Sequence, residues 1–247
     1  EVQKIEEDLG INIRFSVDKT GNGADGSNWV MESELPEMVN VQNDYFTDGV
    51  LEWKGVLANT NLAPAIKTGT YNSYITWSAS TKTYTVLQNF LWTSLGVSNT
   101  DYIELATGET FDGNSKIIDL IGITGWKGLF TSSAVSSINS PLIKNLGILK
   151  GSLNISSGFF VRSGQKFFNI KNCYSTGGIA GSNSGGIIGA NSGTCTITNC
   201  YSTGNIAGDG SGGIAGANAS YLGGTCTITN CYSTGNIAGD GSGGIAG

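Results

Sequence analysis

The chain has 247 residues, of which 38 are glycine, 5 are cysteine and none is histidine. The lack of histidine excludes a histidine-based catalytic triad, an imidazole general base and a His-ligated metal. The chain has 13 Lys and Arg residues against 19 Asp and Glu residues, which gives a net charge of −6. Because it has no excess positive charge to neutralise phosphates, we expect no nucleic-acid partner. The hydrophobic share of 39% is sufficient for a folded core.

The chain carries no sign of a membrane span. No window reaches the roughly 18 consecutive apolar residues that a transmembrane helix needs. The sequence begins at Glu1 rather than at methionine, which is typical of a processed start or of a boundary inside a longer chain. A leader removed before Glu1 is compatible with this start.

Residues 1–100 contain no internal repeat and are expected to form a mostly β capping or assembly region. Residues 11–17 alternate apolar and polar side chains, which predicts a half-buried strand, and residues 71–85 predict one or two more. The apolar residues of 86–95 share one helical face, and Gly96 follows where a helix C-cap would stand. All five tryptophans precede residue 130, as expected of a bulky segment that covers the open end of a repeat array.

The last third of the chain repeats. The hexapeptide Asn172-Cys-Tyr-Ser-Thr-Gly177 recurs at residues 199–204 and 230–235, at offsets of 27 and 31 residues. The second offset contains a four-residue insertion before Cys226, which is typical of a loop growing on one face of a solenoid. Weaker copies extend upstream to residues 143–147 and to a degenerate unit at residues 111–130.

Each unit holds three short apolar pieces separated by Gly, Ser and Asn, with no helical period. This pattern predicts an all-β fold, a right-handed parallel β-helix with coils of about 27 residues over residues 101–247, clearest over 143–247. Gly247 falls inside a repeat, so we expect the β-helix to continue beyond it. A covering subunit or a cut chain is the alternative.

Stacked coils would align equivalent residues into columns. The first column is Leu146, Cys173, Cys200 and Cys231, and the second is Phe168, Cys195 and Cys226. Because each column begins with a large apolar residue, we interpret the cysteines as small apolar core groups. Disulfides within or between coils and a metal site are the alternatives, and the odd number of cysteines leaves at least one unpaired within the chain.

A third column predicts a ladder of side-chain amides that hydrogen-bond to one another along the axis. Its members are Asn145, Asn172, Asn199 and Asn230.

The Asn-Cys-Tyr-Ser-Thr-Gly and Gly-Gly-Ile-Ala-Gly patterns resemble the GLUG-type repeat found in bacterial surface adhesins and in some large secreted proteases. They are also similar to Asn-Cys-Tyr-Ser-Thr-Gly repeats in proteins of giant DNA viruses. The resemblance covers about residues 111–247. It implies a parallel β-helix in a surface protein, and it carries over no catalytic residue.

The chain offers few candidates for chemistry. Asp112 and Asp119 are the best local pair of acids for a polysaccharide enzyme, although the sequence around Asp112 favours a turn residue over a catalytic acid. The Gly/Asp loops around Asp209 and Asp240 supply one carboxylate per coil, too few for calcium. No phosphate-binding Gly-x4-Gly-Lys motif is present. We therefore expect no catalytic residue, no metal and no cofactor.

Two tripeptides fit the N-glycosylation acceptor pattern, at Asn154 and at Asn218. Asn218 lies beside the four-residue insertion, where a loop would be exposed. Because such tripeptides arise often by chance in a chain rich in Asn and Ser, chance occurrence is the favoured interpretation and glycosylation the alternative.

These features favour a structural surface or fibre protein rather than an enzyme. It would form the shaft of an extracellular or virion-surface appendage and self-associate through its N-terminal region into a filament. The alternative is an adhesin-like binding module that recognises a host glycan or protein, for example through the loop around Tyr221. A polysaccharide-processing enzyme ranks last.

Overall fold

The computed structural model describes residues 30–31, 39–40, 60–190, 194–217 and 225–247. The chain divides into two compact units, Glu1–Asn59 and Thr60–Gly247. In the first unit, β1 (Val30–Met31) and β2 (Val39–Asn40) form an antiparallel pair. The strand expected at residues 11–17 lies outside the described residues.

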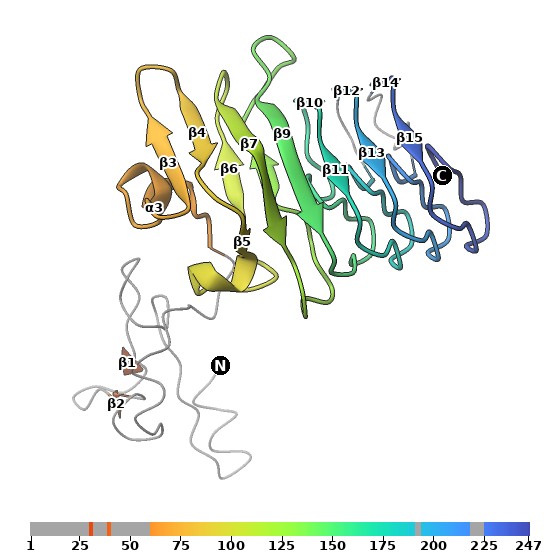
Figure 1. Ribbon diagram of the computed structural model, residues 1–247, viewed down its shortest axis with the longest axis horizontal. Coiled ribbons are helices and arrows are strands. Elements are labelled where there is room, and N and C mark those ends of the chain that lie inside the picture. The colour runs from red at the N-terminus through yellow and green to blue at the C-terminus, as the bar shows by residue number, and fades with distance from the viewer. Residues whose placement is uncertain (1–29, 32–38, 41–59, 191–193, 218–224) are drawn as a thin grey trace, which may run out of the picture. The chain divides into compact units, whose positions relative to one another are not determined.

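The second unit is a β-solenoid of about five turns, in which corresponding strands of successive coils lie side by side (Figure 1). One series of parallel neighbours consists of β4 (Thr83–Val86), β7 (Thr110–Asp119), β9 (Leu142–Leu149), β10 (Phe168–Lys171), β12 (Cys195–Thr198) and β14 (Cys226–Thr229). This arrangement confirms the predicted all-β parallel β-helix.

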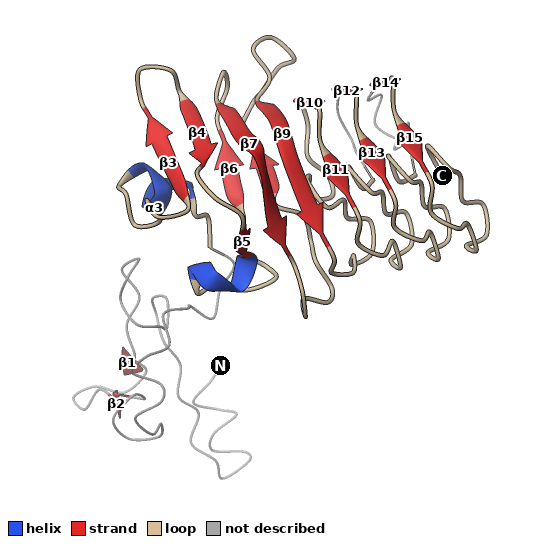
Figure 2. Cartoon of the chain, viewed as in Figure 1, coloured by secondary structure: helices blue, strands red, loops and turns tan. Residues whose placement is uncertain are grey.

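A second parallel series continues from the later half of β9. Its strands are β11 (Tyr174–Ser175), β13 (Tyr201–Ser202) and β15 (Tyr232–Ser233). Between the two series each coil passes through an asparagine with positive φ, and each two-residue strand begins two residues after that asparagine. Figure 2 shows the strands β11, β13 and β15 in red. Isolated parallel bridges close the remaining sides of the coils, for example Gly158 to Gly185 and Gly185 to Gly212.

The start of the second unit contains the short helical segments. Helix α3 (Ala63–Lys67) has a proline in its first turn, where a missing N–H costs no hydrogen bond. Strand β3 (Ile75–Ser78) pairs antiparallel with β4, which confirms the strands expected within residues 71–85.

The helix expected over residues 86–95 is wrong for most of its length. Strand β5 (Phe90–Leu91) pairs in parallel with β7, and only the short 3-10 helix η2 (Trp92–Leu95) follows it. Gly96 caps that segment in the left-handed conformation, with φ of 70°. Pairing with an existing strand overrides the local apolar spacing in this segment.

The solenoid register begins earlier than the expected boundary at residue 101. Thr83 and Tyr84 pair in parallel with Thr110 and Phe111, so residues 60–100 share one compact unit with the coils that follow. Strand β6 (Ile103–Leu105) likewise pairs with β8 (Phe130–Ser132). The sequence hides these first coils because aromatic residues replace the small ones of the later repeats.

The core changes in character along the axis. In the early coils Trp92 packs edge-on against Trp126 with ring centroids 5.3 Å apart, and Phe111 packs against Phe130 at 4.8 Å. The later coils are filled by smaller side chains, all fully buried: Ile197, Cys200, Ile206 and Ile214. The tryptophans Trp92 and Trp126 therefore fill the first coils from inside.

One glycine column shows how closely the coils approach. A Cβ added to Gly204 would collide with the backbone carbonyl oxygen of Gly177 in the preceding coil, whereas a Cβ added to Gly178 meets nothing within 4 Å. We expect Gly204→Ala to lower the free energy of unfolding by about 1–3 kcal/mol or more, and the matched Gly178→Ala to leave it nearly unchanged. Denaturant midpoints measure both, and equal midpoints for the two variants would contradict this packing.

Candidate functional site

The asparagine column forms an axial ladder on the outside of the solenoid. Each of its four members adopts the left-handed conformation, with φ between 53° and 55°. The side-chain amide of Asn172 donates to Asn145 at 3.1 Å, that of Asn199 donates to Asn172 at 3.2 Å, and that of Asn230 donates to Asn199 at 3.3 Å. Asparagine tolerates this backbone conformation better than most residues, so one residue type both makes the bend and joins the coils.

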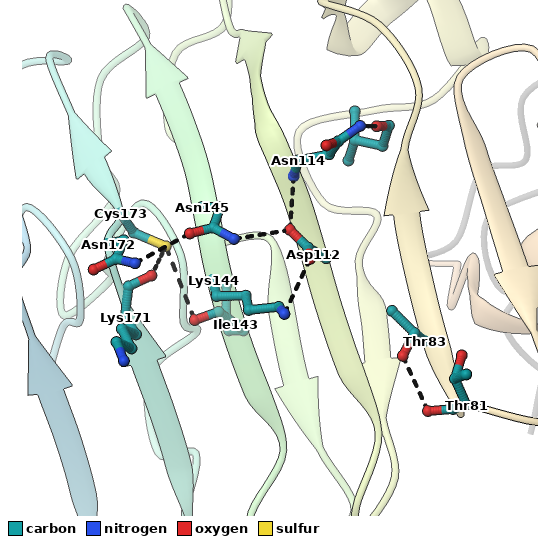
Figure 3. A network of polar contacts seen from close by, with 11 residues as sticks. Thr81, Thr83, Asp112, Asn114, Ile143, Lys144, Asn145, Lys171, Asn172 and Cys173 are labelled. Atoms are coloured by element: carbon teal, nitrogen blue, oxygen red, sulfur yellow. Dashed lines mark hydrogen bonds and ion pairs between the residues drawn. The ribbon is translucent and has the colours of Figure 1, made fainter.

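The ladder ends at a carboxylate. Asp112 accepts a hydrogen bond from the Asn145 amide at 3.1 Å and one from the backbone N–H of Asn114 at 2.8 Å. Its other oxygen pairs with the Lys144 ammonium at 3.1 Å (Figure 3). A carboxylate can only accept, so Asp112 obliges every amide of the ladder to donate in the same direction, toward the N-terminal coils.

The ionisation of Asp112 is linked to stability. Partial burial raises the pKa of Asp112, but the hydrogen bonds from Asn114 and Asn145 and the charge of Lys144 together bring its pKa below the usual range. A lowered folded-state pKa adds stability above the unfolded pKa of about 3.9, and this stability is lost as the pH falls through the folded pKa. We expect the free energy of unfolding of Asp112→Asn to fall less steeply than that of the wild type as the pH is lowered from 6 to 2. Denaturant titrations at a series of pH values measure this difference. If the wild-type protein and Asp112→Asn lose the same amount of stability as the pH falls, the ionisation of Asp112 is not linked to stability.

The first cysteine column lies on the inner side of the same bend. The structure places Leu146, Cys173 and Cys200 in the core, with Cys231 partly buried, and the three cysteines are free thiols. The backbone N–H of Cys173 donates to Cys200 Sγ at 3.4 Å, and the N–H of Cys200 donates to Cys231 Sγ at 3.4 Å. The thiols therefore also satisfy backbone donors between coils, a role beyond that of small apolar groups.

The second cysteine column contains a disulfide. Phe168 pairs with Cys195, and Cys195 pairs with Cys226 in the next coil, as the column predicts. Cys195 and Cys226 are bonded to each other, with Cα atoms 4.6 Å apart. For this pair the structure supports the alternative of a disulfide between coils rather than the favoured interpretation of two apolar core thiols.

The thiols are expected to react only when the protein opens. Burial raises the pKa of Cys173, so little thiolate forms at neutral pH, and its sulfur lies in the core. We expect Cys173 to resist alkylation in the native protein and to react in denaturant. Alkylation followed by peptide mapping should label three cysteines in denaturant alone and five after reduction. Rapid native labelling of Cys173, or five labels without reductant, would contradict this arrangement.

A tyrosine column lies beside the asparagine ladder on the outer face, and the sequence interpretation did not single it out. Tyr174 stacks on Tyr201 with ring centroids 4.9 Å apart, and Tyr201 stacks on Tyr232 at 5.0 Å, both with planes within 4°. Beneath these rings, buried Ser175 donates to the carbonyl of Gly186 at 2.6 Å. The offsets that align the cysteines also align these residues, so the signal was present in the sequence.

Residues 180–207 match the family model described as the GLUG motif. The matched segment contains β12, the bend at Asn199 and β13. Strands β14 and β15 of the next coil repeat the residues of β12 and β13 in register, and β11 of the preceding coil repeats those of β13. The solenoid carries GLUG-type repeats. No curated protein and no solved structure matched the chain in the corresponding searches.

Two acidic residues of the GLUG solenoid, Asp112 and Asp119, form ion pairs with lysines. Asp112 and Asp119 lie near opposite ends of β7, and Asp119 pairs with Lys150 at 2.9 Å. The backbone between them bends at Asn114 and Ser115, which have positive φ, and Asp112 pairs with another lysine, Lys144. Each of the two acids is therefore engaged with its own lysine.

The Gly/Asp loops of the GLUG repeats also use their carboxylates between coils. Asp209 accepts a hydrogen bond from the backbone N–H of Asp240 at 2.9 Å. Across the described residues, no cluster of three or more Cys, Asp or Glu is arranged to hold a metal ion. Within the same part of the chain, no helix has the length and apolar character to cross a membrane.

The two glycosylation candidates remain predictions. The side-chain oxygen of Asn154 accepts a hydrogen bond from the backbone N–H of Ile155 at 2.7 Å, and the Ile155 side chain is exposed. Asn218 lies outside the described residues.

A polar cluster around the buried side chains of Glu109 and Tyr84 in the first coils was not anticipated from the sequence. Glu109 accepts from Lys67 at 2.6 Å and from the hydroxyl of Tyr84 at 3.3 Å, and the Lys67 ammonium lies 4.7 Å from the ring centroid of Trp77. Burial, followed by the charge of Glu109, raises the pKa of Tyr84, so this phenol stays protonated and donates. The residues of this cluster lie far apart in the sequence, so no local motif revealed them. The cluster joins α3 to the first coils.

Proposed function

We propose that the protein is a structural surface or fibre protein in which the GLUG solenoid forms a stiff shaft. The observation that carries the proposal is the unbroken axial ladder, in which each asparagine amide donates a hydrogen bond to the preceding coil and the series ends at Asp112. Such side-chain ladders add to the backbone bonds between coils and resist their separation. In this proposal the chain is not an enzyme and acts mechanically.

The proposal places the protein outside the cell or on a virion surface. A disulfide between coils supports this location, because such bonds persist in oxidising compartments. No Lys or Arg follows Lys171, so the later coils present hydroxyl, amide and phenol groups to the surroundings. Self-association into a filament, through the N-terminal region, belongs to the same proposal.

Electron microscopy of the purified full chain, combined with sedimentation at several concentrations, tests this function. We expect rod-like particles or filaments whose length grows with concentration. Compact monomers at all concentrations would contradict the fibre proposal. A chain lacking residues 1–59 is the matched control. Because the proposal assigns self-association to the N-terminal region, we expect this shortened chain not to assemble.

A second candidate is an adhesin-like module that binds a neutral host glycan or protein. The uncharged outer columns of Asn, Tyr and Thr support this candidate, because aromatic rings with neighbouring amides and hydroxyls suit sugar recognition. Glycan-array binding lost in Tyr232→Ala, or on deletion of residues 220–223, would support it. An array without binding would argue against glycan recognition.

A further inference from the structure

The stacked tyrosines place two pairs of phenols in the geometry of a cross-linking site. Tyr174, Tyr201 and Tyr232 are backbone neighbours in parallel register across three successive coils. Their rings stand 4.9 Å and 5.0 Å apart and lie within 4° of parallel. The buried Tyr84, in contrast, has Trp77 and Phe111 as its ring neighbours.

The column is held at one end and open to reagents on its outer side. Tyr174 pairs with Gly147, and a Cβ on Gly147 would collide with the Tyr174 ring, so that ring lies directly over the backbone of the preceding coil. Tyr174 and Tyr201 are half-buried, and Tyr232 is 52% exposed. The neighbouring thiols, Cys173 and Cys200, point into the core and are buried beneath the column.

We propose that the tyrosine column is a site of oxidative dityrosine cross-linking between adjacent coils, with a haem peroxidase and hydrogen peroxide as the oxidising system. Each phenol loses one electron and its proton and becomes a phenoxyl radical. Two neighbouring radicals join by a carbon–carbon bond between their ortho positions, and in each ring the ortho hydrogen then moves as a proton to the ring's own oxygen, which restores the phenol and its aromaticity. The two electrons and two protons reduce one hydrogen peroxide to two waters.

The stacking favours coupling within one molecule. A neighbour held in place acts at an effective concentration of the order of millimolar, so in a micromolar solution coupling within the column exceeds coupling between molecules by about 1000-fold. Tyr201 belongs to both pairs, so one bond joins it to Tyr174 or to Tyr232. A bond to Tyr232 would join two coils that the Cys195–Cys226 disulfide already connects.

The test is peroxidase treatment of the dilute full chain with limiting hydrogen peroxide. We expect dityrosine fluorescence in the monomer fraction and a mass lower by two hydrogens. The bond should map to the tryptic peptide that begins at Asn172, which holds the whole column. That peptide also contains Tyr221, so a Tyr221→Phe background isolates the column.

Variants within that background make the assignment specific. Tyr201→Phe keeps the ring stack but removes the phenol that both pairs share, and we expect it to reduce the monomer cross-link at least ten-fold. The matched control Tyr74→Phe, whose ring packs against Phe90, should retain it. Dityrosine confined to covalent dimers, or an undiminished yield in Tyr201→Phe, would overturn the proposal.

Discussion

Replacement of Trp126 by alanine is expected to lower the free energy of unfolding by about 3–5 kcal/mol. Trp126 is completely buried, packs edge-on against Trp92 and donates its indole N–H to the carbonyl of Phe159 at 3.0 Å. The alanine variant would lose this hydrogen bond and leave a cavity between successive coils. Chemical denaturation followed by circular dichroism measures the change.

Trp126→Phe is the matched control, because it retains an aromatic ring and loses mainly the hydrogen bond and part of the volume. We expect its destabilisation to be about 1–3 kcal/mol, clearly smaller than that of the alanine variant. Equal effects of the two substitutions, or a negligible effect of Trp126→Ala, would show that this side chain does not fill the first coils.

The disulfide between coils is expected to contribute about 3–4 kcal/mol to stability. Cys195 and Cys226 are 31 residues apart, so their bond closes a loop of that length and restricts the unfolded chain. Unfolding with and without a reducing agent measures this contribution. We expect the reduced protein to unfold at a lower denaturant concentration.

A Cys195→Ser, Cys226→Ser double variant provides the control for that experiment. It should match the reduced protein in stability and show no further response to the reducing agent. If the wild-type protein unfolds at the same midpoint with and without reductant, the bond does not constrain these coils in solution.

The repeated part of the chain was largely predictable from the sequence. Identical hexapeptides at offsets of 27 and 31 residues define the coil, and the aligned Asn and Cys positions fall in the columns that the structure contains. Because the coils stack in parallel and in register, residues at equivalent positions of successive repeats lie next to each other in space. For that reason a simple alignment was sufficient to place Asn199 beside Asn172 and Cys226 beside Cys195.

The first coils and the chemistry of single side chains could not be predicted in this way. Residues 60–100 join the solenoid through pairing with β7, but their aromatic core residues hide the repeat. The pairing of Glu109 with Lys67 and the role of Asp112 as the end of the ladder depend on residues from different elements, which no local pattern brings together. The state of Cys195 and Cys226 likewise depends on the distance between coils.

The most direct test of the account is to measure contacts between the side-chain amides of Asn172, Asn199 and Asn230 by nuclear Overhauser effects in selectively labelled protein. Stacked in-register coils predict cross-peaks between Asn172 and Asn199 and between Asn199 and Asn230, with none between Asn172 and Asn230. If both adjacent pairs lack cross-peaks in the folded protein, the coils do not form the continuous axial ladder on which the proposed structural function rests.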